Sequence, residues 1–593
     1  MATTFLSPMV QVTETDNTTT TPQVGVSTGA TVLPAGWGPV MQPLLVASEN
    51  DLVDTFLAPN DENFKYWFTA SNFLAYTGSM YVTRVGTENQ RNACVAPKAI
   101  GNGLVINNEN DYSTNFEYGS GDFGEFAAKY PGELGNSLLV TYADATTFKD
   151  ENGNSLWTWT DSTGREYDFT QEFSYAPGTS RYVADRDGVN DEIHLLVIDA
   201  AGRFTGTKGA ILEKYEFLSK AKDAKTLDGQ TNFYRTVLKN QSNFVYWMDF
   251  PEEDLLKTEF KLDDTTYQAN GSFGDSCIDT IFPALTAPFL SQFSGGVDDF
   301  ECTDGELMAS YDLFKNKEQY DISLIPCGPV SMMVAKYIVE NICEPRMDCV
   351  AFISPNDEGA PIIGTRQLED TVAWRVAFNV NSSYATMDCG WKYQYDKYND
   401  EYRWVPLNGD HAGIYARTDE TNATWWSGAG YNRGQIKNCV KLSFSPNKME
   451  RDVLYQKGIN PVVTFTGEGT VLYGDKTLLT KPSAFDRMNV RRLFIYLEKT
   501  LEQASKYQLF EFNDEVTRSY AVSLVEPFLR EVMGSRGITA YKVVCNESNN
   551  TVAIINANRF VMDIYVRPNY VINFISLNFV AEKNGSTVFT ETV

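Results

Sequence analysis

The clearest hydrophobic pattern in the chain lies between residues 483 and 503. Apolar residues recur there at the spacing of one helical face: Val490, Leu493, Phe494, Leu497 and Leu501. This stripe predicts an amphipathic helix. Ser483 precedes it and is followed three residues later by Asp486, in the arrangement of a capping box. We therefore expect Ser483 to cap the first turn.

The opposite face of this predicted helix mixes basic and bulky apolar side chains. Its residues are Arg487, Arg491, Arg492, Ile495, Tyr496 and Lys499. A helix face that is fully exposed to solvent is normally polar, so Ile495 and Tyr496 on this face indicate a second packing contact. The arginines also stand near the N-terminal end of the helix, where the helix dipole favours acidic residues.

The first part of the chain divides into an arm and the beginning of a core. Residues 1–22 are rich in Thr and contain one short alternating run, Met9, Val10 and Val12, which predicts an arm with a single strand. Residues 23–92 have a globular pattern. We expect a strand and then a helix capped by Ser48, followed by a helix in "YWFTASNFLAY" and a strand in "MYVTRV".

Two different patterns follow in the middle of the chain. Residues 93–240 are rich in Gly, Asn and Asp with short strands such as "SLLVTYA" and "EIHLLVIDA", which predicts an inserted β-rich domain. Residues 241–480 alternate strands and helices. Within them, "YDISLIPCG", "VSMMVAKYIVENI" and "MDCVAFISP" read as strand, helix and strand, a βαβ-like unit.

The C-terminal part, residues 481–568, begins with the helix described first. We expect a strand in "QLFEFND", then a helix from Glu515 that is kinked at Pro527 and ends at Gly534, and strands in "YKVVC" and "FVMDIYV". Residues 569–593 form a terminal arm with one more strand. This strand is apolar on both faces, at Ile572, Phe574, Ile575, Leu577 and Phe579. Such a strand has to be covered on both faces.

These patterns together predict an α+β multidomain protein. Its mixed α/β core is built from N-terminal and C-terminal parts of the chain, with inserted β-rich outer domains and extended terminal arms. The 593 residues are 43% hydrophobic, which is enough for several packed cores.

Charge and cysteine content narrow the classes of function. The formal net charge of −28 argues against a general nucleic-acid binder, which needs a basic surface. No run approaches the roughly 18 apolar residues of a membrane helix, and "MATTFLSPMV" lacks the features of a secretory signal. The nine cysteines include no C-x-x-C pair and predict free thiols in a reducing cytoplasm.

Few residues suggest chemistry. With only His194 and His411 present, a histidine-rich metal site is excluded, and we expect both to be structural or surface residues. "GRFTGTKGA" at 202–210 resembles a phosphate-binding loop, but its glycine spacing is wrong and it predicts a turn. "DRDGVNDE" at 185–192 lacks the spacing of a calcium loop and predicts a polar turn, with a weak surface cation site as the alternative.

The aromatic stretch "WKYQYDKYNDEYRWVP" at 391–406 has two interpretations. Alternating aromatic residues on two strands around "YND" predict a hairpin with cross-strand pairs. Exposed aromatics could instead stack on sugars, with Asp396 and Glu401 as a carboxylate pair of a glycosidase. Because charged residues make up 21% of the chain, two carboxylates near an aromatic carry little weight.

Many short sequences in order along the chain resemble the tail sheath proteins of contractile-tailed bacteriophages. They include "SPMVQVTETD", "STGATVLPAGWGPV", "AKYPGELGNSLLV", "VPLNGDHAGIYARTD" and "WWSGAGYNRGQI". The run "KPSAFDRMNVRRLFIYLEKT" resembles the most recognisable signature of that family. The resemblance covers most of the chain except residues 148–185 and parts of 250–320.

The resemblance implies a structural protein with no enzymatic activity, cofactor or metal. Family members stack as hexameric rings around the tail tube in a metastable extended state, and they contract without nucleotide hydrolysis. The implied partners are further copies of the chain, the tail tube protein, and baseplate and tail terminator proteins, with neither nucleic acid nor membrane insertion. The implied location is the virion, after synthesis in the host cytoplasm. A sugar- or envelope-binding tail component that uses residues 391–431 is the alternative.

The resemblance also implies roles for the arms and for the C-terminal domain, which faces the tube in the family. The strand-exchange residues would be Met9, Val10, Val12, Ile572, Phe574, Ile575, Leu577 and Phe579. On the helix at 483–503, Ile495 and Tyr496 would contact either the sheet-forming arm of a neighbouring copy or another piece of the same domain. The basic residues would meet acidic groups on a neighbour or on the tube.

Overall fold

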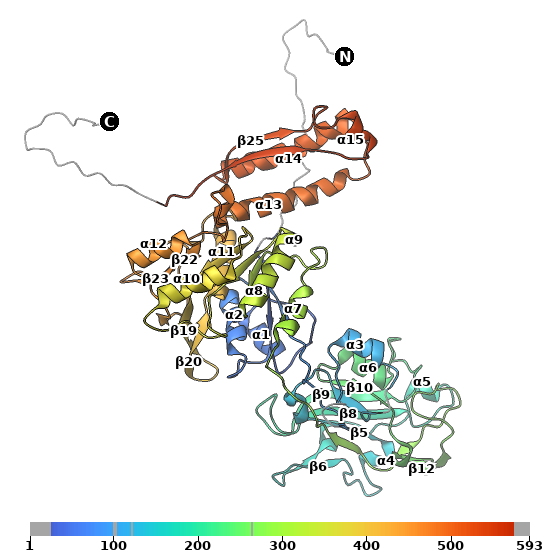
Figure 1. Cartoon of the computed structure of the whole chain (residues 1–593). Coiled ribbons are helices and arrows are strands. Elements are labelled where there is room, and N and C mark those ends of the chain that lie inside the picture. The colour runs from blue at the N-terminus through green and yellow to red at the C-terminus, as the bar shows by residue number, and fades with distance from the viewer. Residues whose placement is uncertain (1–24, 26, 99–102, 120–121, 263–264, 574–593) are drawn as a thin grey trace, which may run out of the picture.

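The computed structural model describes residues 25, 27–98, 103–119, 122–262 and 265–573. These residues form three bodies arranged in a row along an elongated molecule (Figure 1). We call them the inserted domain (90–297), the central domain (27–86 with 303–480) and the C-terminal domain (483–573). Helices and strands are mixed across all three, which confirms the predicted α+β multidomain fold class.

A seven-stranded sheet forms the middle of the central domain. Its strands, in spatial order, are β2 (Leu44–Val46), β3 (Met80–Arg84), β1 (Gly29–Leu33), β16 (Leu324–Pro326), β17 (Val350–Ile353), β18 (Ala385–Asp388) and β22 (Ile459–Asn460). All neighbours are parallel except β2 and β3, which are antiparallel. Gly29 of β1 pairs with both Met80 and Leu324, so the sheet joins two segments far apart in sequence.

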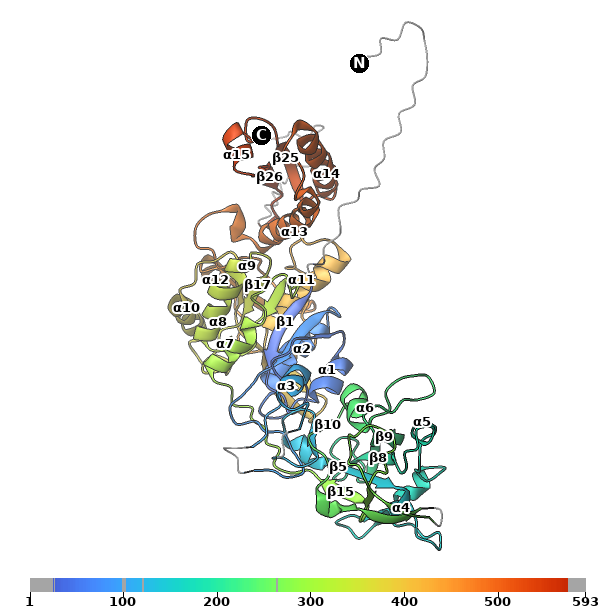
Figure 2. The same ribbon diagram turned by 90° about the vertical axis from the view of Figure 1, so that its right-hand side faces the viewer.

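Helices cover both faces of this sheet (Figure 2), as a parallel sheet with buried apolar strands requires. On one side lie α1 (Glu49–Phe56), α2 (Phe64–Leu74) and α11 (Asn408–Thr421). On the other lie α7 (Asp304–Asp312) and α8 (Met332–Ile338), which continues through a π-helical turn (Val339–Cys343) into α9 (Glu344–Arg346). Helices α10 (Gln367–Phe378) and α12 (Lys448–Gln456) flank the end of the sheet.

Several sequence predictions are confirmed in this domain. The side chain of Ser48 accepts a hydrogen bond from the Asp51 N–H at 3.1 Å and caps α1. Strands β16 and β17 are parallel and joined by α8, as the βαβ-like pattern predicted. The remaining strands of the domain are β19 (Trp391–Asp396), β20 (Glu401–Pro406), β21 (Lys441–Leu442), β23 (Val462–Phe465) and β24 (Gly469–Leu472).

The inserted domain is built on a four-stranded antiparallel sheet. Its order is β15 (Phe289–Gln292), β5 (Leu138–Asp144), β8 (Glu192–Asp199) and β9 (Ala210–Ser219). Its helices are α3 (Glu109–Asn115), α4 (Ala145–Phe148), α5 (Arg181–Ala184) and α6 (Tyr234–Gln241). Its short strands are β4 (Phe126–Ala128), β6 (Thr158–Thr160), β7 (Glu166–Asp168), β10 (Val245–Trp247), β11 (Leu256–Lys257), β12 (Glu259–Leu262), β13 (Thr265–Gln268) and β14 (Ala284–Leu285).

The predicted boundary of this domain at residue 240 is wrong. Strand β10 pairs with β4, and β15 forms one edge of the main sheet by pairing with β5. The rings of Tyr142 and Phe289 stack across that pair with centroids 4.6 Å apart. Residues 245–292 therefore belong to the inserted domain, and the α/β pattern resumes only at α7.

One tryptophan ties the central and inserted domains together. Trp37 follows β1, and its ring lies 5.4 Å from the Tyr130 ring and 5.1 Å from the Phe204 ring, both in edge contacts. Because it is buried within the apolar core of the inserted domain, the two domains share a packed contact beside the two chain crossings.

The C-terminal domain consists of two long helices and a hairpin. Its elements are α13 (Met488–Ser505), α14 (Glu515–Gly534), β25 (Ile538–Val544), α15 (Val552–Asn556) and β26 (Asp563–Pro568). Glu515 begins α14 after an Asp514 cap, and the helix ends at Gly534 with Pro527 inside it, as predicted. The predicted strand in "QLFEFND" is wrong, because residues 509–514 form turns with no partner strand and Phe510 has a φ of +71°.

Strand pairing predicts which fragment of the chain folds alone. A fragment of residues 90–297 keeps all four strands of the inserted sheet, whereas residues 93–240 lack β10, β14 and β15. We expect the longer fragment to unfold cooperatively on heating and the shorter one to show no cooperative transition, by circular dichroism. Equally cooperative unfolding of the two fragments would instead support a domain boundary at residue 240.

Candidate assembly site: helix α13 between two domains

Helix α13 begins later than the sequence predicted. The side chain of Ser483 accepts a hydrogen bond from the Phe485 N–H at 3.3 Å and caps a short 3₁₀ turn, Ala484–Asp486. Arg487 then has an extended backbone, and α13 itself starts at Met488 without a side-chain cap. Ser483 is therefore a cap, but of a separate turn before the helix, and the described residues show no capping-box hydrogen bond from the Ser483 N–H to the Asp486 side chain.

One face of α13 packs against its own domain, as the apolar stripe predicted. Leu493 and Leu497 are buried in a cluster whose other members come from α14 and β25: Val525, Phe528, Leu529, Val532 and Ile538. Full burial of a leucine side chain stabilises a fold by roughly 1.5–3 kcal/mol. This contact therefore holds the two long helices of the C-terminal domain together.

The opposite face of α13 packs on the central domain. Ile495 is only 4% exposed and belongs to the main core of that domain. Tyr496 is partly buried and lies between Trp425 and Phe528, each with ring centroids 5.8 Å away. Tyr496 thus contacts Phe528 of its own domain, as one of the two alternatives predicted, whereas Ile495 contacts a different domain of the same chain.

The expected docking surface at Arg491 and Arg492 is corrected by the structure, because the two side chains are buried within the chain at 6% and 3% exposure. Arg492 forms an ion pair with Asp419 near the end of α11. Burial raises the pKa of Asp419 to about 7, and the guanidinium of Arg492 opposes that rise.

Aromatic rings cover the other arginine. The guanidinium of Arg491 lies 4.0 Å from the Phe485 ring centroid and 4.3 Å from that of Tyr384, and it donates to the Tyr384 hydroxyl at 3.2 Å. Such cation–π contacts hold a charge inside a protein at low cost. Arg491 and Arg492 therefore fix α13 to the central domain.

The remaining two basic residues lie at the edge of this contact. Arg487 donates to the Tyr455 hydroxyl and to the Asp475 carboxylate, the latter at 3.1 Å. Lys499 pairs with Asp321 in the loop before β16. Both therefore bridge the C-terminal domain to the central domain, although they are less buried than Arg491 and Arg492.

Trp425, in the loop after α11, is a bridge that the sequence reasoning missed. Its indole Nε1–H donates to the Ser535 carbonyl at the end of α14, at 3.0 Å. The "WWSGAG" run contributes to the family resemblance, but its local pattern does not indicate a partner 110 residues later in the chain.

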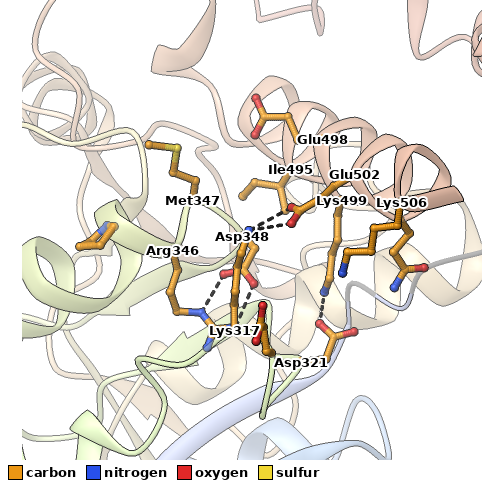
Figure 3. A pocket seen from close by; sticks show the side chains of 13 residues that line it. Lys317, Asp321, Arg346, Met347, Asp348, Ile495, Glu498, Lys499, Glu502 and Lys506 are labelled. Carbon is orange, nitrogen blue, oxygen red and sulfur yellow. Dashed lines mark hydrogen bonds and ion pairs between the residues drawn. The ribbon is translucent and has the colours of Figure 1, made fainter. Parts of the chain in front are cut away.

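A cavity of about 690 Å³ separates the second half of α13 from the central domain (Figure 3). Charged residues line most of it: Lys317, Glu318, Asp321, Arg346, Asp348, Glu498, Lys499, Glu502 and Lys506. Lys317 reaches Glu502 across it at 2.9 Å, and Lys499 reaches Asp321. The contact between α13 and the central domain is thus closely packed at the start of the helix and is formed by ion pairs toward its end.

Comparison with known proteins matches these domains to one family. The model for the phage tail sheath protein central domain matches residues 303–478, and that for the phage tail sheath C-terminal domain matches residues 480–582. The chain is 32% identical to the tail sheath protein of Salmonella phage ViI, an alignment that covers 97% of this chain and 96% of that protein. It is 31% identical to the tail sheath protein of Enterobacteria phage T4, over 98% of each.

This chain belongs to the tail sheath protein family. The crystal structure of the sheath tail protein from Listeria innocua has the same fold, with a TM-score of 0.52, 12% identity, and coverage of 92% of this chain and 93% of that one. The central-domain match begins at residue 303, so strands β1, β2 and β3, which complete the sheet, lie outside it.

The turn that resembles a phosphate loop is filled by the sheath protein itself. The Asp199 carboxylate accepts hydrogen bonds from the backbone N–H groups of Arg203, Phe204 and Thr205 at 2.8–2.9 Å. A bound phosphate would need such N–H groups. The segment is a turn between β8 and β9, as predicted.

The aromatic hairpin of this sheath protein, with its two carboxylates, also has a structural role. Tyr393 lies opposite Trp404 and Tyr395 opposite Tyr402 in the β19–β20 hairpin, as the hairpin interpretation predicted. Asp396 is buried and bonded to Arg403 at 2.9 Å, and Glu401 pairs with the same arginine, so neither carboxylate is free.

Both histidines of the sheath protein are buried. His194 accepts from the Phe217 N–H at 3.0 Å, and His411 packs beside Phe352. Within the described residues, no group of three or more His, Cys, Asp or Glu is placed to hold a metal ion. None of the described helices is both long and apolar enough to span a membrane.

Most of the predicted strand-exchange residues lie outside the described part of the sheath protein. These are Met9, Val10, Val12, Phe574, Ile575, Leu577 and Phe579. Ile572 is described, is 81% exposed and is not part of a strand. The role of these residues stays a prediction.

The sequence reasoning also missed an exposed apolar cluster at the far end of α13, which we call the 507–520 cluster. Its side chains are all at least half exposed: Tyr507, Leu509, Phe510, Phe512, Val516 and Tyr520. The alternation in "QLFEF" predicts a strand, whereas no other described part of the chain covers its apolar residues. Such a cluster is typical of a contact surface.

The buried ion pair predicts the effect of substituting Arg492. In Arg492→Met, Asp419 stays buried without its partner, and we expect the local free energy of unfolding of α13 to fall by about 3 kcal/mol. The loss should be larger at pH 8 than at pH 6. The pKa of Asp419 is raised, so this carboxyl takes up a proton as the pH falls. Once neutral, it is no longer a buried charge that Arg492 has to balance. Hydrogen exchange at the α13 amides measures this.

Two further variants control that experiment. Lys506→Met, directly after the end of the same helix, should leave exchange unchanged, and Arg492→Met combined with Asp419→Asn should recover most of the loss. If hydrogen exchange in α13 were unaffected by Arg492→Met while assembly failed, Arg492 would instead be a contact between copies.

Proposed function

We propose that the chain is the structural subunit of a contractile tail sheath. It polymerises as stacked hexameric rings around the tail tube in a metastable extended state, and it contracts to drive the tube through the host envelope. The observation that carries the proposal is the similarity to tail sheath proteins at 31–32% identity over 97–98% of the chain.

The C-terminal hairpin supports a mesh of strand exchange between copies. Strands β25 and β26 pair only with each other among the described residues, so each has one edge without a partner strand. A two-stranded sheet is marginal by itself and gains from added strands. Each backbone hydrogen bond added contributes about 0.5–1.5 kcal/mol, and many copies multiply that gain. Residues 1–22 and 569–593 of neighbouring copies would supply the strands.

Rigid connection between domains supports a role in transmitting movement. The Arg492–Asp419 pair, Ile495 and Trp425 fix the C-terminal domain to the central domain at three separate places. A rotation of one domain is then passed to the other. The filled turn at Asp199 supports contraction without nucleotide hydrolysis, with the energy stored during assembly.

The proposed partners are other copies of the chain, the tail tube protein, and baseplate and tail terminator proteins. The C-terminal domain would face the tube, where the 507–520 cluster offers an uncovered apolar surface. The proposed location is the virion, after synthesis in the host cytoplasm, without nucleic-acid binding or membrane insertion. The sugar-binding alternative in residues 391–431 is not favoured, since the carboxylate pair that it would use, Asp396 and Glu401, is bound to Arg403.

Removal of the N-terminal arm tests the mesh. A chain lacking residues 1–22 should fold as a monomer with unchanged circular dichroism, because these residues precede the packed core, but it should form no sheath by negative-stain microscopy. A control chain that starts at Met9 keeps the predicted strand at Met9, Val10 and Val12 and should assemble. Regular cylinders from the shorter chain would contradict strand exchange by this arm.

Contraction should need neither nucleotide nor free metal. Assembled extended tails can be dialysed against chelator, freed of nucleotide and then triggered, with contraction scored by electron microscopy. We expect contraction equal to that of untreated tails. A requirement for added ATP or GTP would mean that a nucleotide site had been overlooked.

A further inference from the structure

The root of the N-terminal arm passes beside helix α13. The Nζ of Lys499 donates to the Gly25 carbonyl at 3.1 Å and to the Ser323 hydroxyl at 3.3 Å, and it pairs with Asp321. Backbone bonds continue this contact into the sheet, because the Thr28 carbonyl accepts from the Ser323 N–H at 2.9 Å and from the Leu324 N–H at 3.2 Å. Lys499 thus closes over the chain just before β1 begins.

The root of the C-terminal arm meets the other end of the same helix. Asn573 is the last described residue, five positions after β26. With its amide oriented so that the oxygen faces Arg487, that oxygen accepts from both terminal nitrogens of the guanidinium, at 2.8 and 2.7 Å. Arg487 is itself held by Asp475, so this root is tied to a fixed group.

We infer that α13 is the common anchor of both arm roots, with Lys499 and Arg487 as the positioning residues. The inference rests on the proposed strand exchange between copies and specifies how each copy aims its two arms. Arg487 directly precedes α13 and Lys499 lies on it twelve positions later, and that helix is fixed to the central domain through Arg492 and Ile495. The two arms therefore leave a single rigid body in set directions.

This arrangement has a consequence for how copies move. When neighbouring copies rotate against one another, the arm roots at Gly25 and Asn573 turn together with α13, because Lys499 and Arg487 hold them. A loose root would let an arm reach the hairpin of more than one neighbour. A fixed root restricts the arm to the hairpin of one neighbour, and this restriction keeps the helical arrangement of copies regular.

The test uses the full chain with Lys499→Met, with Asn573→Ala, and with both. Hydrogen exchange of the monomer should become at least three-fold faster at the Gly29, Ser323 and Leu324 amides in Lys499→Met, with the thermal midpoint unchanged. Sheaths of either variant should lose helical order in cryo-electron micrographs, and the double variant should be the least ordered. The matched control is Lys506→Met, since Lys506 lines the same cavity and its side chain has no hydrogen bond or ion pair within the described chain.

Two results would overturn the inference. Unchanged exchange in Lys499→Met would mean that this lysine does not hold the root, and wild-type helical order in the double variant would mean that the roots do not set the lattice. Failure of the wild-type chain to form any sheath would instead contradict the proposed function. The exchange measurement on the monomer tests the anchor even in that case.

Discussion

The ion pair between Arg492 and Asp419 lies at the point where α13 is covered from both sides, by α14 on one and by the central domain on the other. Moving two charges out of water costs several kcal/mol for each ion, and an apolar pair of the same size would often stabilise the fold as well. The pair therefore determines the orientation of the two domains rather than adding net stability. Only one placement of α13 brings the arginine to its carboxylate, so the pair fixes the C-terminal domain in one orientation. The arm roots, the hairpin edges and the 507–520 cluster all take their positions from that placement.

Local sequence predicted the elements of this arrangement but not their partners. The spacing of Val490, Leu493 and Leu497 was sufficient to predict the buried stripe of α13, because helical periodicity is a local property. The partner of Arg492 lies 73 positions away and that of Lys499 lies 178 positions away, and no local pattern encodes such a distance. A buried arginine and an outward one look the same in a sequence, so Arg491 and Arg492 were first placed on a docking surface.

The same limit explains the errors in the domain boundaries. The strands of the inserted domain were recognised from alternation, whereas the assignment of β15 to that domain depends on its pairing with β5, about 150 residues earlier. The apolar residues of "QLFEFND" alternate like a strand, but strand formation also needs a neighbour, and none is present for that segment in the described chain. The family, in contrast, was predicted from the sequence, because many short motifs in a fixed order are more specific than any one of them.

Charge is distributed unevenly along the chain, and this bears on the proposed assembly. Residues 1–480 carry 36 Lys and Arg against 65 Asp and Glu, whereas residues 481–573 carry 12 against 10. Packing copies of such a chain brings acidic central and inserted domains near one another, and their repulsion opposes close packing over a range of about 8 Å at physiological salt. In the proposed assembly, the contacts least weakened by this repulsion would be those without net charge, namely backbone hydrogen bonds to the arms and the apolar 507–520 cluster. Both belong to the C-terminal domain or are anchored by α13, so the proposed contacts between copies would be concentrated in the one part of the chain whose charge is balanced. Repulsion between the acidic domains would then be relieved when neighbouring copies move apart, while the proposed strand exchange would keep them linked.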